Sequence, residues 1–353
     1  MGVHEFAAGF REVKRTLRNR CYRGVVARDS THADYAAKAL EWSRARDVLS
    51  GEDAVKAAGK KYLPRLDSQS DDEYAAYLAR ASFFGATART LEEYLDLVFR
   101  RAPAFALRAT AGRPADGLER FAGDCDLWGA DFLRYARRVV SEVLSVGRAG
   151  SLVAWDDVVK RPWVSEWRAE DIINWSVERV GQVPTLVEVV LRDPPSSGHF
   201  GGTSAGRVRV LRLDGKDGKN GTYECLMEIW EAAKDQSDEK DQKDWTLVET
   251  QVLMRDGQAL TFIPFVFHGL RHSRPELDKL PLGEIIAANL DHYRLVGVKP
   301  IQSAFSEMQN ELCAGLTPAM GKIVKCWGEV FYFFCFFIKS GLCLSAFLLG
   351  CFG

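Results

Sequence analysis

The first half of the chain is patterned as helices. Apolar residues recur there at intervals of three and four, which places them on one face of a helix. The stretches 34–49 and 53–61 are rich in Ala, Lys, Arg and Glu, which favour helices. Asp71 and Asp72 supply the acidic first turn of a further helix, because negative side chains stabilise a helix N-terminus.

Two more helices are expected before residue 147. Thr90 and Glu93 have the Thr-x-x-Glu spacing of a capping box, which predicts that a helix begins here. A longer helix is expected over residues 126–146. Its apolar residues form one stripe: Trp128, Phe132, Tyr135, Val139 and Val143.

After Gly147 the pattern changes to the two-residue alternation of strands. Strand-like segments lie at 152–155 and 163–167. Clearer alternation predicts strands of one antiparallel sheet at 186–191, 207–213, 223–230 and 245–253.

The segments between these strands carry turn and loop signals. The Gly- and Asp-rich segment 214–221 predicts a hairpin. Residues 232–244 are dense in charge, so they are expected to form an exposed, mobile loop between two strands. Pro264 in the apolar run 262–267 favours an edge strand or a bend, because proline cannot donate to a central ladder.

Pro281 then opens a last helix, because proline suits the first helical turn. The sequence therefore predicts an α+β fold. Its expected parts are a basic N-terminal extension (1–31), a helical part (32–149), a β-rich part (150–280), a helix (281–296) and an apolar, cysteine-rich tail (297–353).

Charge and cysteine content narrow the possible functions. The 47 basic and 48 acidic residues give a net charge of −1, so no bulk charge draws the molecule to nucleic acid or an anionic membrane. The basic arm within residues 11–28 is either a contact to phosphate or to an acidic surface, or a solvated or disordered extension. Only three of the eight cysteines lie in the first 312 residues, and this sparse spacing favours a reducing cytoplasm over a disulfide framework. No CxxC spacing occurs, so a zinc site has no support.

Two candidate ligand-binding patterns have simpler interpretations. His268 and His272 stand four apart, the spacing of metal ligands on a helix. They follow a strand-like run, however, so a loop with two surface histidines is expected. The Gly-Lys pairs at 215–216 and 218–219 lack the Ser or Thr that must follow the lysine of a phosphate-binding loop, so they are interpreted as turns.

Acidic and aromatic residues are also interpreted structurally. Asp124, Asp126 and the pair 156–157 lie at element boundaries, where aspartate serves as a cap or turn residue. Six tryptophans of the β-rich part are expected in the core or in cross-strand pairs, rather than as stacking platforms for single-stranded nucleic acid. They are Trp155, Trp163, Trp167, Trp175, Trp230 and Trp245. No catalytic, metal-binding or cofactor-binding residue is predicted, and the chain is not expected to be an enzyme.

An ordered series of runs carries a family resemblance. The runs lie at 51–66, 73–74, 80–81, 83–90, 147–153, 172–175, 263–267 and 289–294. In this order they resemble a prophage family of unknown function that is grouped with bacteriophage portal proteins. The resemblance spans about three-quarters of the chain, from His32 to Arg294, and no single run is a chemical signature. Gly85 stands where relatives tend to carry Asn, a local departure that bears on one turn or cap.

The resemblance implies a structural role in the host cytoplasm and the virion. A portal is a closed ring that gives duplex DNA a channel and contacts the terminase motor, the capsid and tail-adaptor proteins. On this basis, residues 32–280 are expected to form the wing and 281–296 the first stem helix. Relatives continue into a stem, clip, tunnel loop and crown, whereas this chain continues into an apolar tail. The resemblance thus implies a truncated or frameshifted copy.

Three interpretations of the tail stay open. The apolar stretch 330–352 is long enough to span a membrane, although Lys339 near its centre is unfavourable there. The stretch could also be buried in a soluble domain, or be the product of a frameshift or premature end. The membrane interpretation gives the alternative function, a binding protein anchored through residues 330–352.

Overall fold

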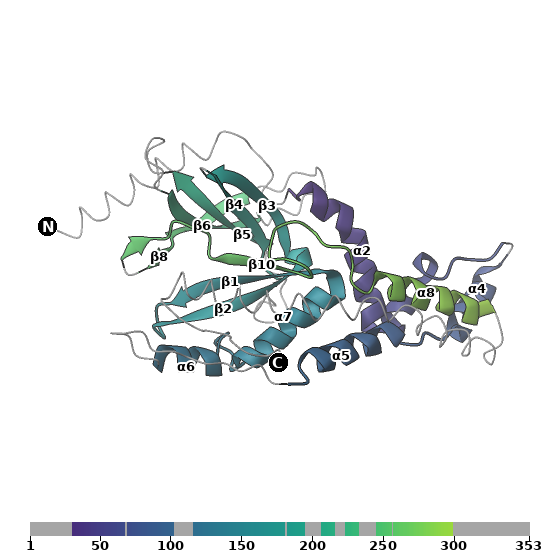
Figure 1. Cartoon of the computed structure of the whole chain (residues 1–353). Coiled ribbons are helices and arrows are strands. Elements are labelled where there is room, and N and C mark those ends of the chain that lie inside the picture. Colours follow the sequence, from purple (N-terminus) through teal and green to yellow (C-terminus); the bar gives the residue numbers. More distant parts are fainter. Residues whose placement is uncertain are drawn as a thin grey trace.

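The computed structural model describes residues 30–67, 69–101, 116–180, 182–194, 206–215, 223–232, 245–255 and 257–298. These residues form the mixed α+β fold that the sequence predicts. Figure 1 shows most of the helices gathered at one end of the molecule and the sheets at the other. Four segments discussed above lie outside the described residues: the N-terminal segment 1–29, the Gly-Lys segment 216–219, the loop 233–244 and the tail 299–353.

The helices of the first half share one core with the last described helix. They are α2 (Ala33–Ser50), α3 (Glu52–Ala57), the 3-10 turn η1 (Gly59–Lys61), α4 (Asp71–Arg80), α5 (Ala86–Val98) and α8 (Gly283–Val298). Trp42, Ala45 and Val48, spaced three residues apart, lie buried on one face of α2. The predicted helix over 34–49 and the predicted helix start at Asp71 are both confirmed.

The predicted capping box at Thr90 is wrong. Helix α5 begins at Ala86, and Thr90 lies inside it, where its hydroxyl donates to the carbonyl of Ala86 at 3.0 Å. A capping box is present at α4 instead, where Ser70 and Glu73 each accept a hydrogen bond from the other's backbone N–H. The four-residue motif also fits a helix interior, because a threonine hydroxyl can bond one turn back.

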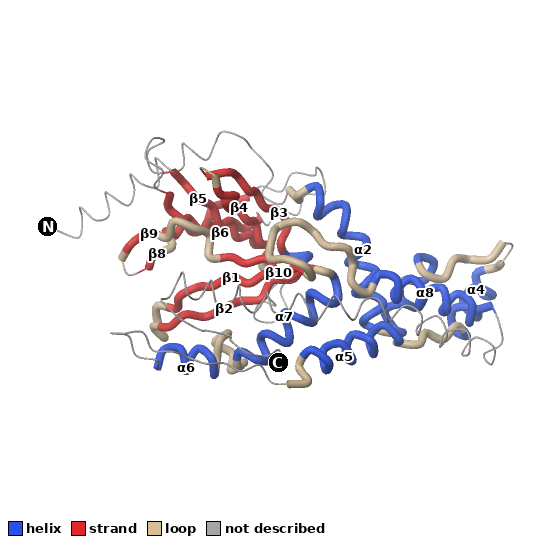
Figure 2. The backbone as a smooth tube through the Cα atoms, in the orientation of Figure 1, coloured by secondary structure: helices blue, strands red, loops and turns tan. Residues whose placement is uncertain are grey.

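Helix α8 is an integral part of the helical core. Leu282, just before it, and Ile286, Leu290 and Tyr293 within it are buried in the core shared with α2, α4 and α5. Figure 2 shows α8 among these helices, although it follows the sheets in sequence. At Gly297 a Cβ would lie 2.8 Å from the ring of Tyr77, so the two helices approach too closely there for a larger residue.

The β-rich part contains two main antiparallel sheets. One has the order β10-β1-β2, from β1 (Arg148–Asp156), β2 (Arg161–Arg168) and β10 (Phe265–Gly269). The other has the order β3-β4-β5-β6-β7, from β3 (Ile172–Val180), β4 (Val183–Arg192), β5 (Arg207–Gly215), β6 (Tyr223–Ala232) and β7 (Trp245–Val252). The short strands β8 (Met254–Arg255) and β9 (Gln258–Ala259) pair separately.

Most of the strand predictions are confirmed. The four strands with clear alternation, β4 to β7, lie side by side in one sheet. Gly215 pairs with Tyr223, so β5 and β6 form the expected hairpin. Strand β10 follows Pro264 and is an edge strand, as the proline predicts.

The three-stranded sheet lies between a helix and the larger sheet. Tyr135 and Val139 of α7 (Phe132–Val146) pack on one of its faces, together with α6 (Asp116–Gly123). Its other face contacts the five-stranded sheet through a core that includes Leu152 and Ile172. Figure 1 shows α7 below β1 and β2, with β3 to β6 above.

The helix predicted over 126–146 begins later than expected. Residues 124–131 form a turn, in which Gly129 has a φ of 87° and Leu127 a φ of 65°. Asp131 then caps α7 by accepting from the backbone N–H of Arg134 at 2.7 Å. As a result Trp128 lies outside the apolar stripe to which it was assigned, and it is 92% exposed.

In the described ranges, no helix is both long and apolar enough to cross a membrane. The stretch 330–352 lies outside these ranges, so the proposed membrane anchor stays a prediction.

We predict that Gly150→Ala destabilises the fold. A Cβ at this position would lie 2.3 Å from the ring of Phe265 and 2.8 Å from the side chain of Ile172. Because overpacking a filled core is unfavourable, we expect a loss of about 1–3 kcal/mol in the free energy of unfolding, measured by urea denaturation. Gly123→Ala is the control, since a Cβ there meets nothing within 4 Å. Equal stability of the two variants would contradict this packing.

Candidate functional site

A buried amide joins α8 to the start of α5. Asn289 is 2% exposed. Its Oδ1 accepts from the backbone N–H and the hydroxyl of Thr87, at 3.1 and 3.0 Å, and its Nδ2 donates to the carbonyl of Phe84 at 2.9 Å. The N-cap residue of α5, Gly85, provides no side-chain cap. Asn289 therefore supplies the cap of α5 from a helix that lies far away in the sequence.

Two further contacts hold the end of α8. The ring of Tyr293 lies edge-on to that of Phe83, with centroids 5.8 Å apart. The Nε of Arg294 donates to the carbonyl of Tyr62 at 3.0 Å. Three side chains of the run 289–294, those of Asn289, Tyr293 and Arg294, thus attach α8 to segments in the first half of the chain.

A charged junction connects the helical part to the β-rich part. Arg46 of α2 donates to Glu170 of η2 (Ala169–Asp171) at 2.8 Å and to Glu142 of α7 at 3.0 Å. The side chains of Arg46 and Glu142 are 26% and 13% exposed. Charge-assisted hydrogen bonds of this kind are stronger than neutral ones, so Arg46 fixes three elements relative to one another.

Burial and neighbouring negative charge favour the protonated form of two carboxyls at the junction. Glu166 of β2 lies 3.3 Å from Arg138. Burial and the negative charge of Glu142 nevertheless raise the pKa of Glu166 to about 7. Burial and the charge of Glu170 likewise raise the pKa of Asp171 to about 6. Two carboxyls of the junction, Glu166 and Asp171, therefore gain protons between mildly acidic and neutral pH, whereas the hydrogen bonds and charge of Arg46 outweigh burial and lower the pKa of Glu170.

A buried hydrogen-bond chain crosses the small sheet. The hydroxyl of Tyr135 lies 2.5 Å from Oγ of Ser151, and that Oγ lies 2.7 Å from Nε2 of His268. Burial lowers the pKa of His268 to about 3, so its imidazole is neutral at physiological pH. A serine beside a histidine is a nucleophile only where a substrate can reach it. Ser151 is 0% exposed and His268 is 1% exposed, so no substrate can reach them. This hydrogen-bond chain therefore contributes to the packing of the core.

The expectation of two surface histidines is wrong for His268. The strand that begins at Phe265 continues through Gly269, and this places His268 opposite Ala149 in the sheet. His272 lies beyond the strand and is partly buried. The described residues include no group of three side chains suited to a metal ion.

The four candidate acids act within turns. Asp126 accepts from the backbone N–H groups of Trp128 and Ala130, at 2.9 and 3.1 Å. Asp156 accepts from those of Val158 and Val159, at 2.9 and 2.7 Å. Asp124 forms an ion pair with Arg161, and Asp157 lies 3.4 Å from Lys160. Asp124 also accepts from the backbone N–H of Gly129 at 2.9 Å, so the prediction as turn residues is confirmed for Asp124, Asp126 and Asp156.

The tryptophan prediction is confirmed in part. Trp167 and Trp175 are each 6% exposed in the core between the sheets. Trp230 and Trp245 pack on the other face of the large sheet. Trp155 is 51% exposed and therefore not in the core, and it lies opposite Pro162 of β2. Trp163 is partly buried on β2, opposite Ala154.

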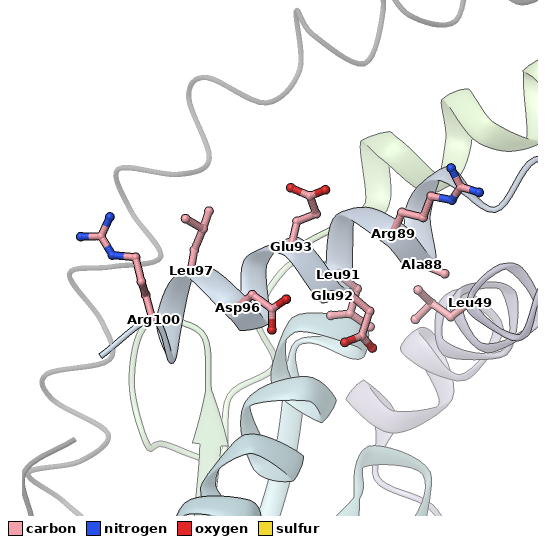
Figure 3. Close-up of a pocket in the computed structure, with 9 residues that line it drawn as sticks. All are labelled: Leu49, Ala88, Arg89, Leu91, Glu92, Glu93, Asp96, Leu97 and Arg100. Carbon is pink, nitrogen blue, oxygen red and sulfur yellow. The ribbon is translucent and has the colours of Figure 1, made fainter. Parts of the chain in front are cut away.

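A hollow of about 790 Å³ lies along α5. Figure 3 shows that Glu93 and Leu97 point away from Glu92 and Asp96. The carboxylates of Glu92 and Asp96 are held by Arg137 of α7, at 3.6 and 2.7 Å. A ligand site needs polar groups that converge, and these diverge. The hollow therefore has no arrangement suited to catalysis.

Comparison with known protein families finds no family that matches the chain. Comparison with curated proteins likewise finds no relative.

We predict that Glu166→Gln alters the pH dependence of stability. The folded-state pKa of about 7 lies above the ordinary value of 4.5, so the stabilising contribution of Glu166 is complete below pH 4.5 and is lost as the pH rises through 7. Glutamine stays neutral. The variant should gain stability relative to the wild type over this window, by on the order of 3 kcal/mol, in urea denaturation from pH 4 to 8.

The exposed Glu178 of β3 provides the control, and Glu178→Gln should run parallel to the wild type across the window. Parallel profiles for Glu166→Gln as well would show that Glu166 titrates normally.

We predict that Asn289→Leu destabilises the fold by about 2–5 kcal/mol, because it leaves buried partners at Thr87 and Phe84 without hydrogen bonds. Chemical denaturation measures this loss. Asp291→Asn, at a 64% exposed side chain on the same helix, should change stability by less than about 0.5 kcal/mol. A double-mutant cycle with Thr87→Ala should give a coupling energy of roughly 0.5–3 kcal/mol; strict additivity would argue against the cap.

Proposed function

We propose that the chain is a portal-like structural protein of a phage or prophage. Such a protein is a subunit of the ring that connects the head to the tail and through which DNA passes. In this proposal residues 32–280 correspond to the wing and residues 281–296 to the first stem helix. The partners would be further copies of the chain, the terminase motor, the capsid, tail-adaptor proteins and duplex DNA. It would act in the host cytoplasm and in the virion, and it would not be an enzyme.

The observation that carries the proposal is that the runs of the resemblance contact one another. They are far apart in sequence, yet residues from six of the eight runs contact residues of another run. The contacts are Asn289 with Thr87, Arg294 with Tyr62, Trp175 with Phe267, and the close approach of Phe265 to Gly150.

This pattern supports a structural function. In an enzyme family, shared residues are expected to include groups that converge on an accessible cleft. Here the residues of the runs are used in caps, aromatic pairs and close packing. The Ser151–His268 pair, which most resembles catalytic chemistry, is enclosed. A ring-forming channel protein needs a rigid body and subunit contacts, and neither requires a nucleophile or a metal.

Ring assembly tests the proposal. We expect that a longer product, obtained by translating the DNA downstream of codon 294 in the frame that restores a helical C-terminal region, forms closed rings. Size-exclusion chromatography with light scattering would give a multiple of the subunit mass, and negative-stain images would show rings. A longer product that remains monomeric at all concentrations would overturn the proposal.

Cell fractionation of the 353-residue chain tests the alternative, a binding protein anchored through residues 330–352. A chain that resists alkaline extraction from membranes would favour the anchor. A chain released by the wash would count against it, and ring formation by the longer product would favour the portal.

A further inference from the structure

Strand β7 forms an open edge of the five-stranded sheet. Its backbone pairs with β6 on one side, and β6 is its only strand neighbour in the described part of the chain. Six of its eight residues are exposed. Because side chains alternate between the two faces of a strand, both faces of β7 are largely open to solvent. The outer N–H and C=O groups of such an edge can pair with another strand.

The edges of β2 and β3 are met by other segments of the chain. The backbone N–H of Val164 in β2 donates to the carbonyl of Cys125 at 2.8 Å. The backbone N–H of His32 donates to the carbonyl of Ile173 in β3 at 2.9 Å. Among the described residues, no backbone segment other than β6 bonds in this way to residues 245–252. β7 is therefore an edge at which the sheet can be extended.

The sequence of β7 favours strand pairing. Edge strands of natural proteins are commonly protected by proline or by charged residues, above all lysine. Residues 245–252 contain no proline and no lysine, and Glu249 is their one charged residue. Leu247, Val248 and Val252 are apolar and are 41%, 54% and 37% exposed. A register shift against β6 falls at Val248, so the strand is regular from Glu249 onward.

The strand is complementary to a second copy of itself. When a two-fold axis relates two identical antiparallel strands, one residue lies opposite its own copy. With Thr250 at this position, Glu249 lies opposite Gln251, and Val248 lies near Val252. Polar side chains then meet polar ones, apolar side chains meet apolar ones, and no like charges face each other, which stabilises a strand pair. Centring the pair on Glu249 would instead place two carboxylates opposite each other.

We infer that β7 is a self-association surface, at which the β7 strands of two copies pair antiparallel about Thr250 and join two five-stranded sheets into one. Such a contact is isologous and joins only two copies, whereas a ring needs a head-to-tail contact. The inference therefore does not rest on the portal proposal. One strand pair covers less surface than a standard protein interface, so we expect a weak, reversible dimer at micromolar concentrations.

Charge changes at Gln251 test the pairing in the full chain. This residue is exposed, so neither substitution disturbs the core. Gln251→Lys places a lysine opposite Glu249 in both halves of the pair and should strengthen the dimer, whereas Gln251→Glu places two carboxylates opposite each other and should weaken it. We expect their dissociation constants, measured by analytical ultracentrifugation at low salt, to differ by about tenfold or more, with the wild type between them.

Two controls accompany this measurement. Gln182, in the turn between β3 and β4, is also exposed. Gln182→Lys and Gln182→Glu make the same charge changes away from β7, and both should keep the dissociation constant of the wild type. Hydrogen exchange of a peptide that covers residues 245–252 should become slower as protein concentration rises, because pairing protects the outer amides.

Three results would overturn the inference. The first is a monomer at every micromolar concentration for both the wild type and Gln251→Lys, with rapid exchange of residues 245–252, which would leave the edge to a strand of another protein. The second is a dimer with equal dissociation constants in Gln251→Lys and Gln251→Glu, because another surface would then join the copies. The third is slow exchange of residues 245–252 in the dilute monomer, because the chain would then cover its own edge.

Discussion

Helix α5 cannot cap its own N-terminus, and much of the architecture follows from how this need is met. Gly85 has no side chain to accept a hydrogen bond, so the acceptor comes from Asn289, which is 202 residues from Thr87. An amide can both accept and donate, and Asn289 satisfies the carbonyl of Phe84 as well. Because the group is buried, α8 can bind the helical core in only one register. The β-rich part is thereby closed into a loop between two helices that contact each other.

The charged junction acts beside this cap with a different physical character. The Asn289 cap is neutral and does not change with pH, whereas the junction includes Glu166 and Asp171, whose raised pKa values make their charge depend on pH. Both kinds of contact connect the helical part to the β-rich part. The structure thus has one connection whose geometry is fixed and one whose strength varies with solution conditions.

The sequence predicts the elements better than the contacts between them. Composition locates α2, and periodicity locates α4 and the strands β4 to β7, because each of these signals is local in the sequence. It misplaces the start of α7, since the turn at 124–131 depends on positive φ angles that only Gly129 signals. Asn289 is visible as a polar residue on an apolar helix face, but its partners are not. The burial of His268 and of Arg148 depends on sheet packing that no local pattern encodes.

The distance in sequence between Thr87 and Asn289 also bears on the order of events during synthesis. Helices α2 to α5 leave the ribosome long before α8 is made, so their shared apolar face lacks its final partner while the sheets are being translated. Contacts of such long range slow folding, and exposed apolar surface on an incomplete chain invites aggregation. A nascent chain that ends before α8 would leave this face uncovered and become a substrate for chaperones.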